Sequence, residues 1–359
     1  MPLALKPWLQ TSYTELQTAL RLGRLPASVI ISGDLRLESS LLALEIAKLY
    51  LCEDPVNGEC CAKCHSCMQL SNPDLSHPDF LGVLSTTKES FDREEDLSHR
   101  ACDLIANCEH AEATVLRIDT LRRFQEWIMQ SSMGSRGKVA VIANAHLMPE
   151  AAANAILKTF EEPPAHTLII MLTKSTDALL PTILSRAFKL YIHRPDYATA
   201  LKELESLGVD TKFAPQALCL NGDAPKAAAT MLKEGKIEKI LDLIQSLSLA
   251  LVNQGDPQAF IDKLFALEEK NAIFLAPERA AILEEFLLEL LKYKAHVSLV
   301  KLPLLQECKV ELLSKIKAQK IFAAKDALKF LRGGNNMTAL RAPAIFMRSW
   351  IDSLKPEGN

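Results

Sequence analysis

Residues 29–40 read VIISGDLRLESS, a β-branched run that leads into a glycine and then into a helical pattern. Two further continuously apolar runs lie at 139–142 and 168–172, and a second helical pattern follows the first of them at about 149–160. Such runs are typical of central strands in a parallel sheet that helices cover on both faces. The sequence therefore predicts an α/β domain with helical crossovers, in which a helix at about 38–51 follows the first strand.

The pattern of apolar and polar residues changes after Pro195. From there to the C-terminus, amphipathic helical stretches alternate with glycine-containing breaks, and no stretch has a convincing strand pattern. We expect an α/β domain at 1–195, a small helical lid at 196–236 and an all-helical C-terminal domain at 237–359. The polar, acidic segment at 86–114 lacks periodicity and is interpreted as a surface insertion.

Composition narrows the class of protein. The 359 residues are 48% hydrophobic and 24% charged, which is enough apolar material for more than one core. No apolar run approaches the roughly 20 residues that span a bilayer, and the N-terminus lacks the apolar stretch of a secretory signal. We therefore expect a cytoplasmic protein with no membrane partner. The formal net charge of -3 argues against binding nucleic acid mainly through bulk electrostatics.

Four of the nine cysteines lie close together in the sequence. They are Cys52, Cys61, Cys64 and Cys67, with eight, two and two residues between them. In a reducing compartment this crowding favours metal ligation over disulfides, and four thiolates bind Zn²⁺ tetrahedrally at about 2.3 Å each. We predict a zinc module at 52–67 with these four ligands. Cys60 or His65 could replace one of them, and a set of buried free thiols is the alternative.

The residues after the first strand have the frame of a phosphate-binding loop, in which a glycine is followed after four residues by Gly-Lys-Ser/Thr. The positions of this frame are Gly33, Glu38, Ser39 and Ser40. Glu38 replaces the second glycine and Ser39 replaces the lysine, so a carboxylate stands near the helix N-terminus where phosphates would bind. We predict that this loop binds no nucleotide, although a generic strand-to-helix turn would carry the same first glycine.

The strand at 138–142 has the frame of the second ATPase strand, which normally ends in Asp-Glu. These two acids bind Mg²⁺ and orient the attacking water. Ala143 and Asn144 occupy the two positions here, and neither side chain can hold the metal or act as a base. Two catalytic positions are therefore missing from one chain.

Basic residues cluster around the same strand. They are Arg117, Arg122, Arg123, Arg136 and Lys138. Such a set could form a patch that faces DNA or a partner protein, and a solvated surface is the default interpretation.

Two segments carry a family resemblance. Residues 151–164 read AAANAILKTFEEPP and residues 184–187 read LSRA. The first resembles the AAANALLKTLEEPP segment of bacterial DNA polymerase III clamp-loader subunits, which are AAA+ type proteins, and the second resembles their Ser-Arg-Cys motif. The cysteine spacing and the segments PWL at 7–9 and HPDF at 77–80 also fit this family. The resemblance is strong to about residue 195 and faint in the C-terminal domain.

The resemblance implies a five-subunit loader that opens a ring-shaped sliding clamp and places it on primed DNA, with gamma or tau and delta subunits as partners. It also implies that the C-terminal domain is a collar that joins the subunits. Within the family, the degenerate positions at the loop and the second strand indicate the non-ATPase delta prime subunits rather than the active ATPases gamma and tau. Zn²⁺ is then the expected cofactor, and no bound nucleotide is expected.

The resemblance also implies a role for one arginine. In this family the Ser-Arg-Cys arginine reaches the γ-phosphate of ATP bound by a neighbouring subunit, and Arg186, preceded by Ser185, matches it. Ala187 replaces the cysteine, which matters less because the guanidinium supplies the charge. The simpler alternative is an exposed arginine that pairs with a surface carboxylate.

Two other functions are consistent with some of these residues. One is a working ATPase of the same family, which nucleotide binding by the isolated chain would favour. The other is a zinc-dependent nucleic-acid-binding protein that acts alone, which tight DNA binding by the pure monomer would favour.

Overall fold

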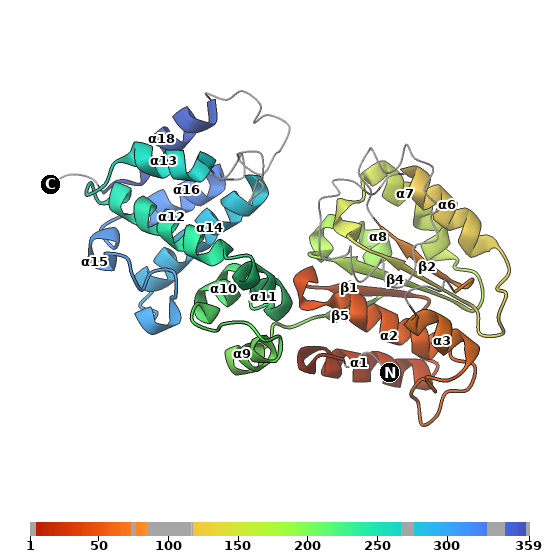
Figure 1. The fold of residues 1–359 in the computed structure, drawn as a ribbon. Coiled ribbons are helices and arrows are strands. Elements are labelled where there is room, and N and C mark those ends of the chain that lie inside the picture. Colours follow the sequence, from red (N-terminus) through yellow and green to blue (C-terminus); the bar gives the residue numbers. More distant parts are fainter. Residues whose placement is uncertain are drawn as a thin grey trace. The chain divides into compact units, whose positions relative to one another are not determined.

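The computed structural model describes residues 5–72, 77–84, 116, 118–266, 276–328 and 342–356. The chain divides into two compact units, Met1–Pro195 and Asp196–Asn359 (Figure 1). The segment interpreted as an insertion at 86–114 lies outside the described residues. Among the helices of the described ranges, none is both long enough and apolar enough to cross a membrane.

A five-stranded parallel sheet forms the centre of the first unit. Its strands are β1 (Ser28–Ser32), β2 (Phe80–Val83), β3 (Lys138–Ile142), β4 (Thr167–Thr173) and β5 (Phe188–Tyr191). They lie in the order β2-β3-β4-β1-β5, so β1 is paired on both sides. Every residue of β1, β3 and β4 is buried, as expected for continuously apolar strands between two layers of helices.

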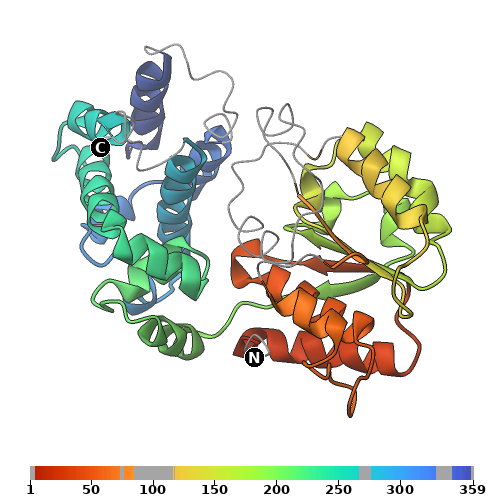
Figure 2. The ribbon, with the colours of Figure 1, turned by 45° about the vertical axis from the view of Figure 1, so that its right-hand side comes forward.

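Helices cover both faces of this sheet (Figures 1 and 2). One face carries α1 (Gln10–Arg21), α2 (Ser39–Leu51) and α3 (His65–Ser71), and the other carries α6 (Ile118–Met129), α7 (Glu150–Glu161) and α8 (Pro181–Leu184). Side chains alternate along each strand, so Ala140 and Ile142 of β3 pack in one cluster with Phe124 of α6 and Ile156 of α7. The predicted α/β class is confirmed, and the two predicted helices begin within one residue of their expected positions.

The structure corrects the expectation for Lys138, one of the five basic residues assigned to a candidate patch or a solvated surface. Arg122, Arg123 and Arg136 are exposed, and Arg117 lies outside the described residues. Lys138, the first residue of β3, is 4% exposed, and its Nζ donates a hydrogen bond to the carbonyl oxygen of Trp127 at 2.6 Å. The same Nζ lies 4.4 Å from the centre of the Trp127 ring. Burial lowers the pKa of Lys138. The lysine therefore fastens the end of α6 to the sheet and is not a surface charge.

The second unit is helical at every element that the structure describes. Its α-helices are α9 (Tyr197–Ser206), α10 (Ala214–Leu220), α11 (Pro225–Lys233), α12 (Lys236–Leu251), α13 (Pro257–Ala266), α14 (Ala276–Lys294), α15 (Val310–Leu313), α16 (Ala318–Ala327) and α18 (Ala342–Leu354). A small apolar cluster joins α9, α10 and α11, and a larger one joins α12, α13, α14, α16 and α18. The helical C-terminal region is confirmed, and its division into a lid at 196–236 and a collar at 237–359 stays a prediction.

Candidate functional site

The four clustered cysteines converge at the junction of α2 and α3. Cys52 ends α2, Cys64 is the N-cap of α3, Cys67 lies in its first turn, and Cys61 lies in the connecting loop. Their four sulfur atoms all lie within 4.8 Å of one another. A tetrahedral ion with bonds of about 2.3 Å would separate its sulfurs by about 3.8 Å, so this donor set fits a metal ion after small movements. Neither Cys60 nor His65 belongs to the group.

Backbone amides support the charged form of these thiols. The amide of Cys61 donates to the sulfur of Cys52 at 3.3 Å, that of Cys64 to Cys61 at 3.3 Å, and that of Cys67 to Cys64 at 3.4 Å. The amides of Lys63 and Cys64 lower the pKa of Cys61 to about 6, whereas burial raises the pKa of Cys52 and of Cys67. Amides that donate to sulfur favour the thiolate, which is the form that binds a metal.

Helix α1 holds the loop that carries Cys61. The Oη of Tyr13 donates to Glu59 Oε2 at 2.9 Å, and Gln17 Nε2 donates to the carbonyl oxygen of Gly58 at 2.9 Å and to Glu59 Oε1 at 2.6 Å. Burial and the Glu59 hydrogen bond raise the pKa of Tyr13. Tyr13 and Gln17 lie one turn apart on the same helical face. Sequence analysis missed both, because each contact joins positions more than forty residues apart and has no local signal.

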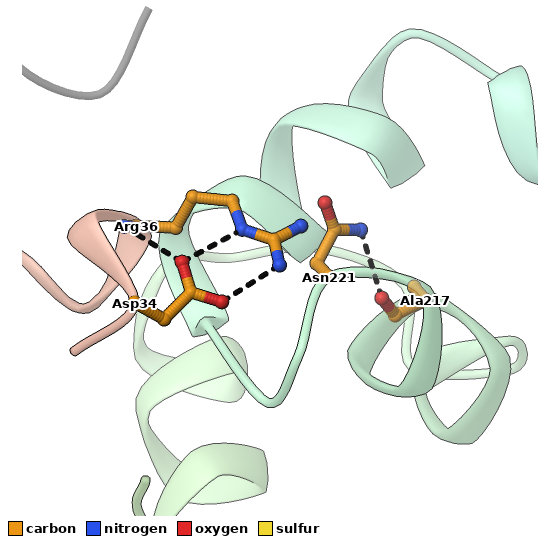
Figure 3. Close-up of polar contacts among 4 residues, drawn as sticks. All are labelled: Asp34, Arg36, Ala217 and Asn221. Carbon is orange, nitrogen blue, oxygen red and sulfur yellow. Dashed lines mark hydrogen bonds and ion pairs between the residues drawn. The ribbon is translucent and has the colours of Figure 1, made fainter. Parts of the chain in front are cut away.

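The turn after β1 is closed by its own side chains. Gly33 has a φ of 142°, and a Cβ there would lie 2.9 Å from the carbonyl oxygen of Ile192. Asp34 accepts hydrogen bonds from Arg36 Nε at 3.0 Å and from Nη2 at 2.7 Å (Figure 3). Burial opposes the charge of Asp34, but Arg36 outweighs it and holds the pKa of this carboxyl below its usual value. The guanidinium is thus neutralised within the turn.

Glu38 has a backbone conformation that favours glycine. Its φ of 60° lies in the left-handed region, which glycine adopts without strain. The residue is buried and makes no capping hydrogen bond to α2. Ser39 and Ser40 begin α2, and their buried hydroxyls have no hydrogen-bond partner among the described residues. That this turn is a phosphate-binding loop without its lysine and its second glycine stays a prediction.

The end of β3 has no acidic group at the two expected positions. Ala143 and Asn144 are both buried, and Asn144 is left-handed with a φ of 53°. The next polar side chain, His146, is neutral at pH 7, because burial and the charge of Lys174 lower its pKa to about 4. This edge of the sheet therefore presents an amide and a neutral imidazole where a Mg²⁺ site would need carboxylates.

Arg186 lies at the surface directly after α8. Its side chain is 45% exposed, and its Nη2 lies 3.5 Å from Oε1 of Glu161, the last residue of α7. Its Nη1 donates to the carbonyl oxygen of Thr182 at 3.2 Å, and the Ser185 hydroxyl donates to the same carbonyl at 2.9 Å. The predicted arginine is thus accessible, and it has a carboxylate partner within its own chain.

Comparison with known proteins assigns the first unit. Residues 8–196 match the family model described as DNA polymerase III, delta subunit, which is more than half of the chain. The chain belongs to this family. The clamp-loader resemblance of residues 151–164 and 184–187 is therefore confirmed.

Individual members of the DNA polymerase III family show how far the similarity extends. The chain is 26% identical over 289 residues to subunit delta' of Escherichia coli K12, covering 80% of the chain and 76% of that protein. It is 28% identical over 237 residues to subunit delta' of Haemophilus influenzae, covering 66% and 64%. It is also 25% identical over 264 residues to subunit tau of Escherichia coli K12, covering 73% of the chain and 35% of tau.

Proposed function

We propose that this chain is a non-ATPase stator subunit of a bacterial DNA polymerase III clamp loader. In this role it works in the cytoplasm, in a complex with gamma or tau and delta subunits. It helps to open the sliding clamp and to place it on primed DNA. The observation that carries the proposal is an exposed Ser-Arg pair on a domain whose own nucleotide positions lack phosphate-binding and metal-binding groups.

The loop after β1 supports the absence of ATPase activity. A working loop offers a lysine and free backbone amides to the phosphates. Here Ser39 replaces the lysine, and Arg36 already pairs with Asp34. Without acids at Ala143 and Asn144, no side chain at these positions can bind Mg²⁺ or orient water.

Arg186 supports a role at the nucleotide site of a neighbouring subunit. Its guanidinium is exposed and permanently charged, which suits recognition of phosphate oxygens. Because the chain lacks a competent site of its own, Arg186 has no nucleotide to serve in cis. We therefore assign it as an arginine finger in trans, with Ser185 as the motif residue that caps the end of α8.

The cysteine cluster supports a structural zinc ion. Cys52, Cys61, Cys64 and Cys67 would hold Zn²⁺ as four thiolates, without an open position for substrate. The ion would link the end of α2 to the start of α3. In the proposed assembly the collar at 237–359, which follows the lid at 196–236, provides the contacts with other subunits.

The test is the rate of ATP hydrolysis by reconstituted complexes that contain the Arg186→Ala subunit. Arginine fingers contribute roughly 10³ to 10⁵ in rate at the site that they serve. Other sites keep their own fingers, so we expect a partial loss of bulk DNA-stimulated hydrolysis and of clamp loading. Arg186→Lys should recover little, because an ammonium lacks the planar fork.

Arg24→Ala is the matched control, because Arg24 is also an exposed arginine of the first unit and lies outside the candidate basic patch. Gel filtration checks that every complex assembles. An assembled Arg186→Ala complex with undiminished hydrolysis and clamp loading would contradict the arginine-finger assignment and leave the subunit a scaffold.

A further inference from the structure

Two contacts fix the direction of the Arg186 side chain. Nη1 is held by the Thr182 carbonyl within α8, and Nη2 by the Glu161 carboxylate at the end of α7. The two contacts come from different helices, and both act on the terminal nitrogens. Together they orient the guanidinium between the ends of α7 and α8.

The ion pair between Arg186 and Glu161 orients the arginine but is too weak to prevent it from binding a phosphate group. Side-chain exposure is 45% for Arg186 and 42% for Glu161, and exposed pairs of this kind are weak. A guanidinium has five N–H donors, so two contacts leave donors for phosphate oxygens. A long arginine side chain otherwise loses much rotamer freedom when it is fixed on a ligand. A weak contact that already orients it reduces that loss.

We propose that Glu161 is a positioning residue for Arg186. This inference rests on the proposed function, since it concerns how the finger is presented to ATP on a neighbouring subunit. The carboxylate acts through the arginine and does not itself touch the nucleotide. Its neighbour Glu162 is also exposed but makes no ion pair within the described part of the chain, so only one of these two adjacent acids has the role.

The experiment compares four variants of the full chain in reconstituted complexes: Glu161→Gln, Glu162→Gln, Arg186→Ala, and the double variant Glu161→Gln/Arg186→Ala. We measure kcat and KM for DNA-stimulated ATP hydrolysis, with folding checked by circular dichroism and assembly by gel filtration. Loss of an exposed pair should lower turnover at the served site about two- to fivefold, with KM for ATP unchanged. Glu162→Gln should match wild type.

The double variant separates positioning from a general structural role. If Glu161 acts only through Arg186, Glu161→Gln should have no further effect once Arg186 is alanine. The inference is overturned if Glu161→Gln leaves kcat unchanged, if it raises kcat because the carboxylate withholds the arginine, or if it lowers kcat equally in both backgrounds. Unchanged activity of Arg186→Ala would remove the arginine-finger assignment and this inference together, whereas a slow Arg186→Ala complex with normal Glu161→Gln turnover removes the inference alone.

Discussion

Cys60 and Cys61 are neighbours in the chain but have different surroundings. Two amides stabilise the thiolate of Cys61, whose sulfur lies in the four-sulfur group. Burial and the charge of Glu45 in α2 raise the pKa of Cys60. Lys48, which pairs with Glu45, acts in the opposite direction. Of these two adjacent cysteines, only Cys61 has its sulfur in the four-sulfur group.

We predict one tightly held zinc per chain, lost in Cys61→Ser and kept in Cys60→Ser. The reason is that a structural zinc site takes four thiolates and no fifth. Metal analysis of the purified single variants checks this, with Cys308→Ser as a control for loss of a thiol elsewhere. Metal loss in Cys60→Ser together with retention in Cys61→Ser would show that the ligand assignment is wrong.

Glu289 is a buried carboxyl group in the second unit. It is 1% exposed, and it accepts hydrogen bonds from the Cys219 thiol at 3.1 Å and from the amide of Leu304 at 3.0 Å. Glu285 lies near the same thiol, and Lys292 pairs with Glu285 at 3.4 Å. Burial raises the pKa of Glu289 to about 7. This carboxyl joins α14 to α10 and to the turn at 302–305.

The raised pKa of Glu289 predicts a pH dependence of stability. Below the usual value of 4.5 the carboxyl is neutral in both states, and its contribution to folding is complete. As the pH rises from 4.5 to about 7, the unfolded chain releases the proton while the folded chain keeps it, so about 3 kcal/mol of the free energy of unfolding is lost. Above about 7 this contribution does not change further.

Glu289→Gln should remove this dependence, because an amide does not ionise. Relative to wild type, the variant should gain roughly 2 kcal/mol in the free energy of unfolding between about pH 5 and pH 8. Urea unfolding at several pH values measures the difference. Glu311→Gln, at an exposed position of α15, is the control and should show no such gain. Parallel pH profiles for wild type and Glu289→Gln would contradict the prediction.

At the scale of elements, one carboxylate orders the connection between α6 and β3. Asp79, directly before β2, is 1% exposed, and its Oδ1 and Oδ2 accept the amides of Met133 at 2.8 Å and Gly134 at 2.6 Å. A Cβ on Gly134 would lie 3.1 Å from Oδ2, which favours glycine at this close approach. The Met133 side chain, 82% exposed, contributes little to holding the turn.

We predict that Asp79→Ala lowers the free energy of unfolding of the first unit by about 2–3 kcal/mol, since two amides lose a charged acceptor. Asp79→Asn keeps one good acceptor and should lose less. Urea unfolding gives the energy, and limited proteolysis should cut the variant faster at 130–137. Asp119→Ala, which removes an exposed carboxylate, should change stability by less than about 0.5 kcal/mol. Equal stability of Asp79→Ala and wild type would show that the turn is held by other contacts.

At the scale of the whole molecule, the first unit has a five-stranded parallel sheet, and Asp34 and Arg36 pair with each other in the turn after β1. We predict that the purified protein neither hydrolyses Mg-ATP nor binds it tightly. Ser39 stands where a phosphate-binding lysine would be needed, and Ala143 and Asn144 at the end of β3 carry no carboxylate to bind Mg²⁺. Calorimetric titration of a nucleotide-free preparation checks this. A heat signal with a micromolar dissociation constant would favour the active ATPase of the same family.

The sequence by itself determined the class of the fold, the position of the cysteine cluster and the family. Each of these has a local signature: a continuous apolar run for a doubly covered strand, short spacings between ligands, and a contiguous motif at 151–164. Burial of a whole strand and grouping of nearby thiols depend on residues that are close in sequence. Both features can therefore be predicted from one sequence alone.

Only the tertiary structure decided which distant side chains meet. Crossovers of the sheet bring the end of α7 to the end of α8 and so pair Glu161 with Arg186, and the packing of α1 brings Tyr13 to Glu59. Lys138 was expected at the surface because lysine is charged, yet its stem lies within the packed end of β3 and its ammonium reaches the Trp127 carbonyl. Such contacts depend on where whole elements lie relative to one another, and no local pattern of polarity or spacing encodes that position.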